Sequence, residues 1–250
     1  MPAAARAVEA MVAEAGTGDV VLVLVSGGGS AMLPAPVAGV TLADKAAANR
    51  VMLGGGLDIT RMNLVRQAMS RLKGGGLVRL AAPARVAALI LSDVIGDDLR
   101  VVASGPTVAP IGTRAEARAM LCAAGLWAAL PEAVRGVLGQ PDEEGVSAPA
   151  ENRLIGSNAL SVRAMARATG GTIWSEALEG DVGAAALWLA EKMRVAVPGI
   201  YLCGGETTVV VRGAGLGPDQ QRDERGYLIE PEERSGGGWG GGVDGGNFGL

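Results

Sequence analysis

The chain has 250 residues, of which 49% are hydrophobic and 19% are charged, and its formal net charge is −4 at pH 7. This length and apolar fraction exclude intrinsic disorder for most of the chain and allow one large domain or two smaller ones. Histidine is absent, which excludes Ser-His-Asp catalysis, Cys-His catalysis and histidine-ligated zinc. The acidic balance argues against nucleic acids and acidic membrane surfaces as partners.

The N-terminal stretch and the cysteines indicate a cellular compartment. The first fifteen residues carry Arg6, Glu9 and Glu14 within an apolar background, which predicts an amphipathic helix and not a signal peptide. No apolar run approaches the roughly 18 residues that a membrane span needs. Cys122 and Cys203 fit no CxxC or zinc spacing, and we expect two buried thiols in a reducing environment. These features together predict a soluble, cytoplasmic protein.

Short apolar runs alternate with helical stretches in the first half of the chain. The runs at 20–25 and 86–91, followed by 101–103, are rich in aliphatic residues and are typical of strands buried on both faces. A helical stretch from Thr41 to about Leu80, broken by the glycines 54–56, separates the first two runs, and it opens with a pattern like a capping box. Strands that alternate with helices predict a mainly parallel sheet with helices on both faces.

A second alternation follows a polar, proline-bearing stretch. A helix at 113–125 leads into residues 140–149, which we interpret as a linker. The expected elements beyond it are strands at 153–155 and 172–174, helices at 157–169 and 181–195, and a strand pair, 200–203 and 207–211, around the glycines 204 and 205. From about residue 217 the chain is too rich in glycine and charge to fold by burying apolar surface.

The pattern predicts an α/β fold in three parts. The larger part is an α/β/α sandwich with a mainly parallel sheet, and the smaller part is an incomplete α/β domain. The parts are residues 1–148, residues 149–216 and a Gly-rich disordered tail at 217–250.

A glycine-rich turn directly follows the first predicted strand. It consists of Ser26, Gly27, Gly28, Gly29 and Ser30. Backbone N–H groups in such a turn can approach an anion closely, and ligands of open parallel sheets bind beyond the carboxyl ends of the strands. The turn matches neither a Walker loop nor a dinucleotide fingerprint. The alternative is a tight strand–helix turn without a ligand.

A basic stretch without carboxylates follows between Asp58 and Asp93. It holds six basic residues and no acidic one. Helical spacing predicts a core stripe and a neighbouring polar stripe that ends at a glycine run. The core stripe is Met62, Val65, Met69 and Leu72, and the polar stripe is Asn63, Arg66, Ser70 and Lys73. In an acidic protein, such a stretch indicates an anionic ligand such as phosphate or carboxylate, and the alternative is a solvated basic face.

Polar residues also follow the other predicted strands. Asp93 and Asp97 come after the strand at 86–91, where they could hold Mg²⁺, accept a proton or simply form a turn. The hydroxyl-rich turn of the next strand holds Ser104, Gly105 and Thr107. Late in the chain, the group Gly205, Glu206 and Thr207 forms either a hairpin turn or a polar edge that faces the first domain across a cleft.

Five motifs in this order resemble the glycerate 2-kinase family, whose members often carry the name hydroxypyruvate reductase. The motifs are LVSGGGSAMLPAP, NLVRQAMSRLKGG, LILSDVIGDD, ASGPT and YLCGGETTVVVRG. The resemblance implies ATP-dependent phosphorylation of D-glycerate to 2-phosphoglycerate, with Mg²⁺, between a sandwich domain and a smaller α/β domain. The implied partners are D-glycerate and ATP, and a homo-oligomer is compatible with it.

The resemblance also implies roles for the residues that match its motifs. The implied catalytic residues are Arg66, Lys73 and Asp93, and Asp93 and Asp97 are the implied metal ligands. The implied substrate and nucleotide contacts are Ser26, Gly27, Gly28, Gly29, Ser30, Asn63, Ser104, Gly105, Thr107, Gly205, Glu206 and Thr207.

The sequence departs from the family at both ends. The family's N-terminal segment, with a lysine implied in catalysis, has no counterpart here, and the chain after residue 221 does not match the family's continuation. We therefore expect a chain truncated at both ends. The alternatives to an active kinase are a non-catalytic remnant that binds nucleotide or glycerate, and a hydroxypyruvate reductase. The reductase lacks support because no GxGxxG motif follows a strand and no histidine is present.

Overall fold

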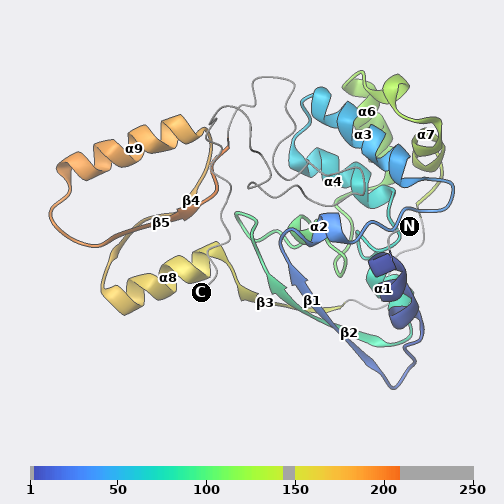
Figure 1. Ribbon diagram of the computed structural model, residues 1–250, viewed down its shortest axis with the longest axis horizontal. Helices are drawn as coiled ribbons and strands as arrows, with labels where there is room; N and C mark the ends of the chain where they lie inside the picture. The colour runs from blue at the N-terminus through green and yellow to red at the C-terminus, as the bar shows by residue number, and fades with distance from the viewer. Residues whose placement is uncertain (1–2, 143–149, 209–250) are drawn as a thin grey trace, which may run out of the picture. The chain divides into compact units, whose positions relative to one another are not determined.

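The computed structural model describes residues 3–142 and 150–208 (Figure 1). The chain divides into two compact units, Met1–Ala168 and Thr169–Leu250, each described here by itself. The predicted boundary at 148/149 stays a prediction. Most of the predicted linker, residues 143–149, and the predicted tail at 217–250 lie outside the described residues.

A parallel three-stranded sheet organises the first unit. Its strands are β1 (Val20–Ser26), β2 (Arg85–Leu91) and β3 (Glu151–Gly156), in the order β1-β2-β3. β1 and β2 run in register from Val20 opposite Arg85 to Ser26 opposite Leu91. Parallel strands joined by helices confirm the predicted α/β class.

The apolar run at 101–103 is not a strand, which corrects the sequence prediction. It forms the 3₁₀ turn η1 (Val102–Ser104), in which Ala103 and Ser104 have positive φ angles of 49° and 61°. The turn closes through the amides of Ser104 and Gly105, which donate to the carbonyls of Val101 and Val102, both at 2.9 Å. A chain with two successive residues in the left-handed region cannot extend as a strand, so apolar composition alone was misleading.

The helices of the first unit are α1 (Ala3–Ala13), α2 (Gly29–Met32), α3 (Leu42–Gly54), α4 (Ile59–Ala68), α5 (Gly76–Ala81), α6 (Arg114–Ala123), η2 (Trp127–Ala129), α7 (Glu132–Leu138) and α8 (Asn158–Thr169). Helices lie in the stretches predicted to be helical, and α2, η2 and α7 are further helices that were not predicted from the sequence. The predicted capping box at the start of α3 is confirmed. The Thr41 hydroxyl accepts from the Asp44 amide at 3.1 Å, and the Asp44 carboxylate accepts from the Thr41 amide at 2.9 Å.

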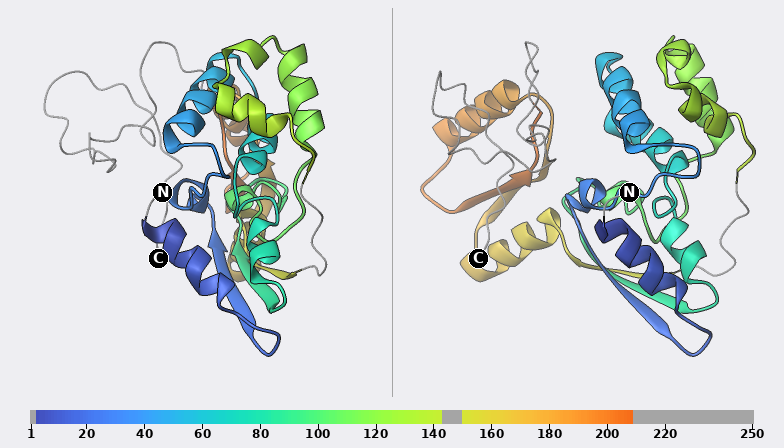
Figure 2. Two further views of the ribbon diagram at one scale, coloured as in Figure 1. Left: turned by 90° about the vertical axis from the view of Figure 1, so that its right-hand side faces the viewer. Right: turned by 45° about the vertical axis from the view of Figure 1, so that its right-hand side comes forward.

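Two groups of apolar side chains form most of the core of this unit. α1 and α5 cover one face of the sheet, where Ala5, Leu77 and Val86 are buried together. α3, α4, α6 and α7 pack around a second cluster that includes Met52 and Val65, and Figures 1 and 2 show these four helices side by side. The predicted core stripe, Met62, Val65, Met69 and Leu72, is buried throughout.

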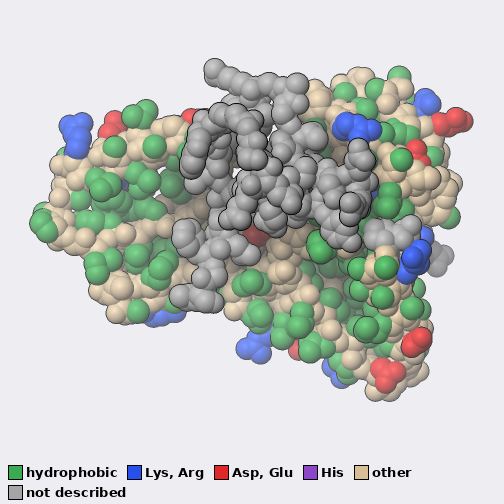
Figure 3. Space-filling view, viewed as in Figure 1, with side chains coloured by type: hydrophobic (Ala, Val, Ile, Leu, Met, Phe, Trp, Pro, Cys, Tyr) green, Lys and Arg blue, Asp and Glu red, His purple; other side chains and the backbone are tan. Residues whose placement is uncertain are grey.

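The opposite face of the sheet is largely uncovered in the described structure. Leu22 and Leu24 of β1 are 60% and 75% exposed, whereas Val25 is buried. Hydrophobic side chains are visible at the surface in this part of the unit in Figure 3. The expectation that the run at 20–25 is buried on both faces is therefore wrong, and a second covering helical layer is not among the described residues.

The second unit contains a parallel pair of strands. β4 (Thr172–Leu178) pairs with β5 (Tyr201–Gly205), and α9 (Val182–Val195) connects them. Trp174 stacks on Tyr201 with ring centroids 4.2 Å apart and meets Trp188 edge-on at 6.5 Å. The aromatic contacts fix α9 on this strand pair. Of the predicted second strand at 207–211, residues 209–211 lie outside the described residues.

Two further expectations concern the burial of the cysteine thiols and the presence of membrane-spanning helices. Cys122 is exposed and Cys203 half-buried, so the prediction of two buried thiols is wrong, although both thiols are free.

Among the described residues, no helix combines the length and the apolar character that crossing a membrane requires.

Candidate active site

A buried lysine connects the glycine-rich turn after β1 to the basic stretch. The Lys73 ammonium nitrogen donates to the backbone oxygen of Ser30 at 2.8 Å and to the Ser30 hydroxyl at 2.7 Å. Lys73 is only 6% exposed. Tertiary folding thus brings together two predicted site residues that are 43 positions apart in the sequence.

Ser104 continues this connection. Its hydroxyl lies 2.9 Å from the Ser30 hydroxyl and donates to the side-chain oxygen of Asn63 at 3.3 Å. A serine hydroxyl carries one proton, so the Ser30 hydroxyl is the donor to Ser104. The result is a directed chain of hydrogen bonds from Lys73 through Ser30 and Ser104 to Asn63.

Turn η1 is held in its left-handed conformation by neighbouring backbone and side-chain donors. The carbonyl of Ser104 accepts from the Gly74 amide and from the Gln67 side chain, both at 3.1 Å. The carbonyl of Gly105 accepts from the Gly75 amide at 2.9 Å. Left-handed non-glycine residues persist where surrounding contacts over-determine them, and they concentrate at functional sites. Gln67, which the sequence reasoning did not select, is therefore a supporting residue.

Arg66 reaches the same network from α4. Its Nε donates to the Asn49 side-chain oxygen at 3.0 Å, and its terminal nitrogen lies 3.5 Å from the side-chain oxygen of Asn63. Burial lowers the pKa of Arg66 from its usual value. The side-chain oxygen of Asn63 therefore accepts hydrogen bonds from both Arg66 and Ser104.

Lys45 is a site residue that the sequence reasoning missed. It lies on α3, one turn before Asn49, and its ammonium nitrogen is buried without a hydrogen-bond partner among the described residues. Burial, and then repulsion from Arg66, lower its pKa to about 8. Burial, followed by repulsion from Lys45 and Arg66, lowers the pKa of Lys73 to about 7. The four-residue spacing of Lys45 and Asn49 was the available sequence signal.

Lys73 is buried and Lys45 and Arg66 are half-buried, and none of these three cations is paired with a carboxylate in the described part of the chain. Ion pairs there include Arg61 with Asp58, Arg71 with Glu9, Arg85 with Glu151, and Arg100 with Asp98. Buried charges normally have a counter-ion, because desolvation strongly disfavours an isolated one. Lys45, Arg66 and Lys73 thus form an electropositive cluster suited to an anionic ligand.

Asp93 lies beside the glycine-rich turn. A methyl group built on Gly27 would overlap the Asp93 carboxylate, so the absence of a side chain at residue 27 admits this carboxylate. Asp97 lies four residues further on, with a positive φ of 54°. Within residues 3–142 and 150–208 no group of three or more potential metal ligands occurs, so these two carboxylates form at most a partial metal site.

Two predicted residues have structural roles instead. The Thr107 hydroxyl donates to Asn152 at 2.6 Å and thereby fixes the loop after η1 to β3. The Ser70 hydroxyl accepts from the Lys73 amide at 3.3 Å. The predicted helix through residue 73 is wrong, since α4 ends at Ala68. There the backbone pairs with the segment around Pro36 instead: the Arg71 amide donates to the carbonyl of Ala35 at 2.8 Å.

Gly205, Glu206 and Thr207 belong to the second unit. They lie at the carboxyl end of β5, with Glu206 exposed and Thr207 half-buried. Their membership of the site stays a prediction.

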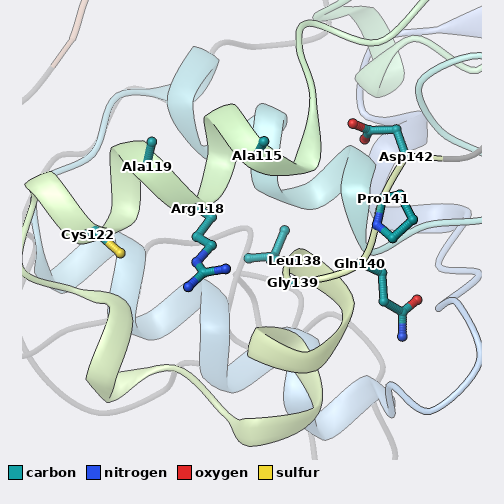
Figure 4. Close-up of a pocket in the computed structure, with 9 residues that line it drawn as sticks. All are labelled: Ala115, Arg118, Ala119, Cys122, Leu138, Gly139, Gln140, Pro141 and Asp142. Carbon is teal, nitrogen blue, oxygen red and sulfur yellow. The ribbon is translucent and has the colours of Figure 1, made fainter.

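A surface hollow of about 410 Å³ lies elsewhere, between α6 and the end of α7 (Figure 4). It contains none of the predicted site residues. The guanidinium of Arg118 lies 5.3 Å from the centre of the Trp127 ring, and Asp142 accepts from the Arg114 amide at 2.8 Å. Both charged side chains at this hollow therefore have structural contacts, and the buried cation cluster is the stronger candidate.

Comparison with known proteins adds independent information. The model of the family described as "Domain of unknown function (DUF4147)" matches residues 2–139. Glycerate kinase of Bos taurus is 40% identical over 220 residues, which cover 84% of this chain and 40% of that protein. A protein of Agrobacterium vitis provisionally named hydroxypyruvate reductase is 40% identical over 221 residues, 82% of this chain and 50% of that protein.

A solved structure agrees with these sequence relatives. The crystal structure of glycerate kinase from Thermotoga maritima matches with a TM-score of 0.72 and 30% identity, over 86% of this chain and 55% of that chain. The chain spans about half of the length of the relatives that it matches. With its motifs, fold and relatives in agreement, the chain belongs to the DUF4147 family, the glycerate 2-kinase family of these proteins.

Proposed function

We propose that this chain phosphorylates D-glycerate with ATP, as a glycerate 2-kinase. The observation that carries the proposal is the network of the buried Lys73 and the half-buried Arg66, two cations without a paired carboxylate among the described residues. Relatives named glycerate kinase support the choice of substrate. The preference for the 2-hydroxyl comes from the family resemblance.

The network suits phosphoryl transfer because this reaction depends on positioning and charge neutralisation more than on covalent chemistry. Lys73 and Arg66 are held by hydrogen bonds to Ser30 and Asn63, so their positions are set before the substrate binds. In the transfer, the substrate hydroxyl oxygen bonds to the γ-phosphorus, and the bond from that phosphorus to the β,γ-bridging oxygen breaks. Fixed cations in a dry site stabilise the charge of the transferred group.

Asp93 is the proposed proton acceptor. Its carboxylate lies at the glycine-rich turn, where the loss of the hydroxyl proton would occur in this scheme. Proton transfer to a positioned carboxylate is an established way to assist such an attack. The electron pair of the broken P–O bond stays on the bridging oxygen, which leaves as part of ADP.

Mg²⁺ is the proposed metal, and the residues present fit it. Mg²⁺ is commonly bound by one or two carboxylates together with substrate phosphates, and it keeps several waters. Asp93 and Asp97 are the carboxylates that would hold it. When bound, the ion neutralises phosphate charge.

The remaining parts of the proposal concern the second unit and the cell. Gly205, Glu206 and Thr207 are proposed to contribute to the nucleotide or substrate site. Two free thiols, at Cys122 and Cys203, favour a reducing compartment such as the cytoplasm. We retain a homo-oligomer as an expectation.

³¹P NMR of the 250-residue chain with D-glycerate, ATP and Mg²⁺ tests the function. We expect a new phosphomonoester signal that grows as ATP falls, and its proton coupling identifies the phosphorylated hydroxyl. In Arg66→Gln the initial rate should fall by about 100-fold, because a preorganised electrostatic contact is lost. Arg61→Gln is the matched control, since Arg61 lies on the same helix and pairs at the surface with Asp58.

The opposite result is equally informative. Absence of the new signal, while the glycerate kinase of Thermotoga maritima produces it in the same buffer, would overturn the proposal and favour the non-catalytic alternative. Oxidation of NADH in the presence of hydroxypyruvate, followed by absorbance, would favour the reductase.

A further inference from the structure

Lys45 is an unusual lysine for a residue outside the motifs. The chain has three lysines, and each has a different environment. Lys192 is exposed on α9 and lies over the Trp188 ring, and Lys73 is buried but bound to Ser30. The ammonium nitrogen of Lys45 is buried and has no hydrogen-bond partner within residues 3–142 and 150–208. An ammonium group has three N–H donors, and leaving them all unused in a buried position is strongly unfavourable.

The hydrogen bonds of its helix neighbour Asn49 indicate that Lys45 lies next to the proposed active site. Asn49 lies one turn after Lys45 on α3, so both side chains leave the same face of that helix. Asn49 accepts a hydrogen bond from Arg66 at 3.0 Å. Arg66 also contacts Asn63, which accepts a second hydrogen bond from the Ser104 hydroxyl. The electrostatic effect of Arg66 on Lys45, and of both on Lys73, agrees with this proximity.

The three cations of the cluster have N–H donors that form no hydrogen bond in the described structure. Lys73 uses two of its three N–H donors on Ser30, and Arg66 uses two of its five on Asn49 and Asn63. Lys45 uses none in the described structure. Unused donors from three converging cations require an acceptor with several oxygens and more than one negative charge.

We propose that Lys45, Arg66 and Lys73 together form a binding site for a phosphate-type tetrahedral oxyanion, with Lys45 as a direct ligand. A phosphate group near neutral pH carries a charge of about −1.5 to −2 and three acceptor oxygens, which matches three cations better than a singly charged carboxylate does. In the proposed kinase, on which this identification rests, the ligand is the phosphoryl group of the nucleotide or product. Anion binding itself can be measured without turnover.

NMR of the chain with isotope-labelled lysine ε-carbons tests the site directly, because only three signals are expected. Titration with inorganic phosphate should raise the pKa of Lys45 and Lys73 by about one pH unit or more, since a nearby anion favours the charged form. Lys192 is the internal control and should not respond. A Lys45 titration curve that is the same with and without phosphate would overturn the proposal.

Variants test the same point by affinity. Phosphate binding, measured calorimetrically, should weaken about tenfold or more in Lys45→Met, because a charge-assisted contact is lost. Lys45→Arg should restore most of the affinity, and Lys192→Met should match the original chain. D-Glycerate alone is the carboxylate arm of the experiment, and tighter binding of glycerate than of phosphate at Lys45 would reject the assignment. Phosphate affinity unchanged in Lys45→Met would also reject it.

Thermal unfolding without phosphate gives a second readout. Lys45→Met should unfold at a temperature equal to or above that of the original chain, because it removes a buried charge without a partner. A purely structural lysine would give the opposite result, with destabilisation in the absence of any anion.

The two proposals fail separately. Phosphate binding that depends on Lys45, without phosphorylation of glycerate, would retain the anion site and reject the kinase. Phosphorylation that survives Lys45→Met at full rate, with unchanged phosphate affinity, would retain the kinase and reject the role of Lys45.

Discussion

At the scale of single residues, the site is defined by lysines in an environment that disfavours their charge. Lys73 is held by Ser30, yet burial and two neighbouring cations lower its pKa to about 7. In the unfolded chain its pKa is near 10.5. The folded state therefore binds fewer protons than the unfolded state between these two values, and protonation of Lys73 at lower pH disfavours folding.

This difference predicts how stability depends on pH. The contribution of Lys73 should make the free energy of unfolding rise between about pH 7 and pH 10.5, with the full penalty present below pH 7. Denaturant unfolding of the chain and of Lys73→Met from pH 6 to pH 10 measures it. We expect the difference between the two proteins to change by a few kcal/mol, at about 1.4 kcal/mol per pKa unit. A constant difference across this range would contradict the low pKa, and Lys192→Met is the control.

At the scale of secondary-structure elements, short connections position the site more than the helices and strands do. The one-turn helix α2 just after β1 contributes Ser30, turn η1 contributes Ser104, and the segment between α4 and α5 contributes Lys73. Gln67 at the end of α4 holds η1 in place through both the nitrogen and the oxygen of its side-chain amide. It donates to the carbonyls of Arg100 and Ser104, and it accepts from the Ile111 amide.

Replacement of Gln67 should therefore destabilise the protein. Gln67→Met keeps the size of the side chain but removes three hydrogen bonds, and it leaves the Arg100 carbonyl and the Ile111 amide without their described partner, each at a cost of about 1 kcal/mol or more. We expect the melting temperature to fall by about 5–10 °C, measured by circular dichroism. The matched control is Gln140→Met at an exposed position. Equal melting temperatures for the two variants would show that Gln67 does not support η1.

The turn after β1 offers a complementary test with little effect on folding. In Gly27→Ala the new methyl group would displace the Asp93 carboxylate, which is an exposed side chain that can rotate. We expect the melting temperature to change by less than about 2 °C, as for other surface substitutions, and the rate of glycerate phosphorylation to fall at least about tenfold. Gly18→Ala, which meets no neighbouring atoms, is the control. An unchanged rate in Gly27→Ala would exclude a role for the observed Asp93 position.

At the scale of the whole molecule, the uncovered sheet face is the main irregularity. β1 is an edge strand among the described strands, and Leu22 and Leu24 expose most of their apolar surface. Exposed apolar edge strands promote association with other chains. The 250-residue chain should therefore self-associate as its concentration rises.

Leu24→Lys tests this expectation. Leu24 is 75% exposed, so the substitution removes little packing and should change the free energy of unfolding by no more than about 0.5 kcal/mol. A charged edge residue should reduce the self-association measured by sedimentation velocity. Val25→Lys is the contrasting variant, because Val25 is buried and this change should prevent folding. Association of Leu24→Lys equal to that of the original chain would rule out this face as the cause.

Much of the secondary structure was predictable because its signals are local. Apolar runs marked β1 and β2, and Thr41 with Asp44 marked the start of α3. The end of α4 was not predictable from periodicity, because pairing with the segment around Pro36 interrupts the helix. The same limit applies to η1, where hydrogen bonds from residues distant in the sequence hold two left-handed residues that an apolar run does not reveal.

The candidate site shows the same division. Composition and motif order alone determined the absence of histidine chemistry, the family resemblance, and the selection of Arg66 and Lys73 within a stretch without carboxylates. Only the tertiary structure decided that Ser30 binds Lys73, that Lys45 is a buried cation beside them, and that Thr107 is engaged by β3. The physical reason is that sequence patterns report residue type and local periodicity, whereas charge burial and hydrogen-bond partners depend on segments that meet only when the chain folds.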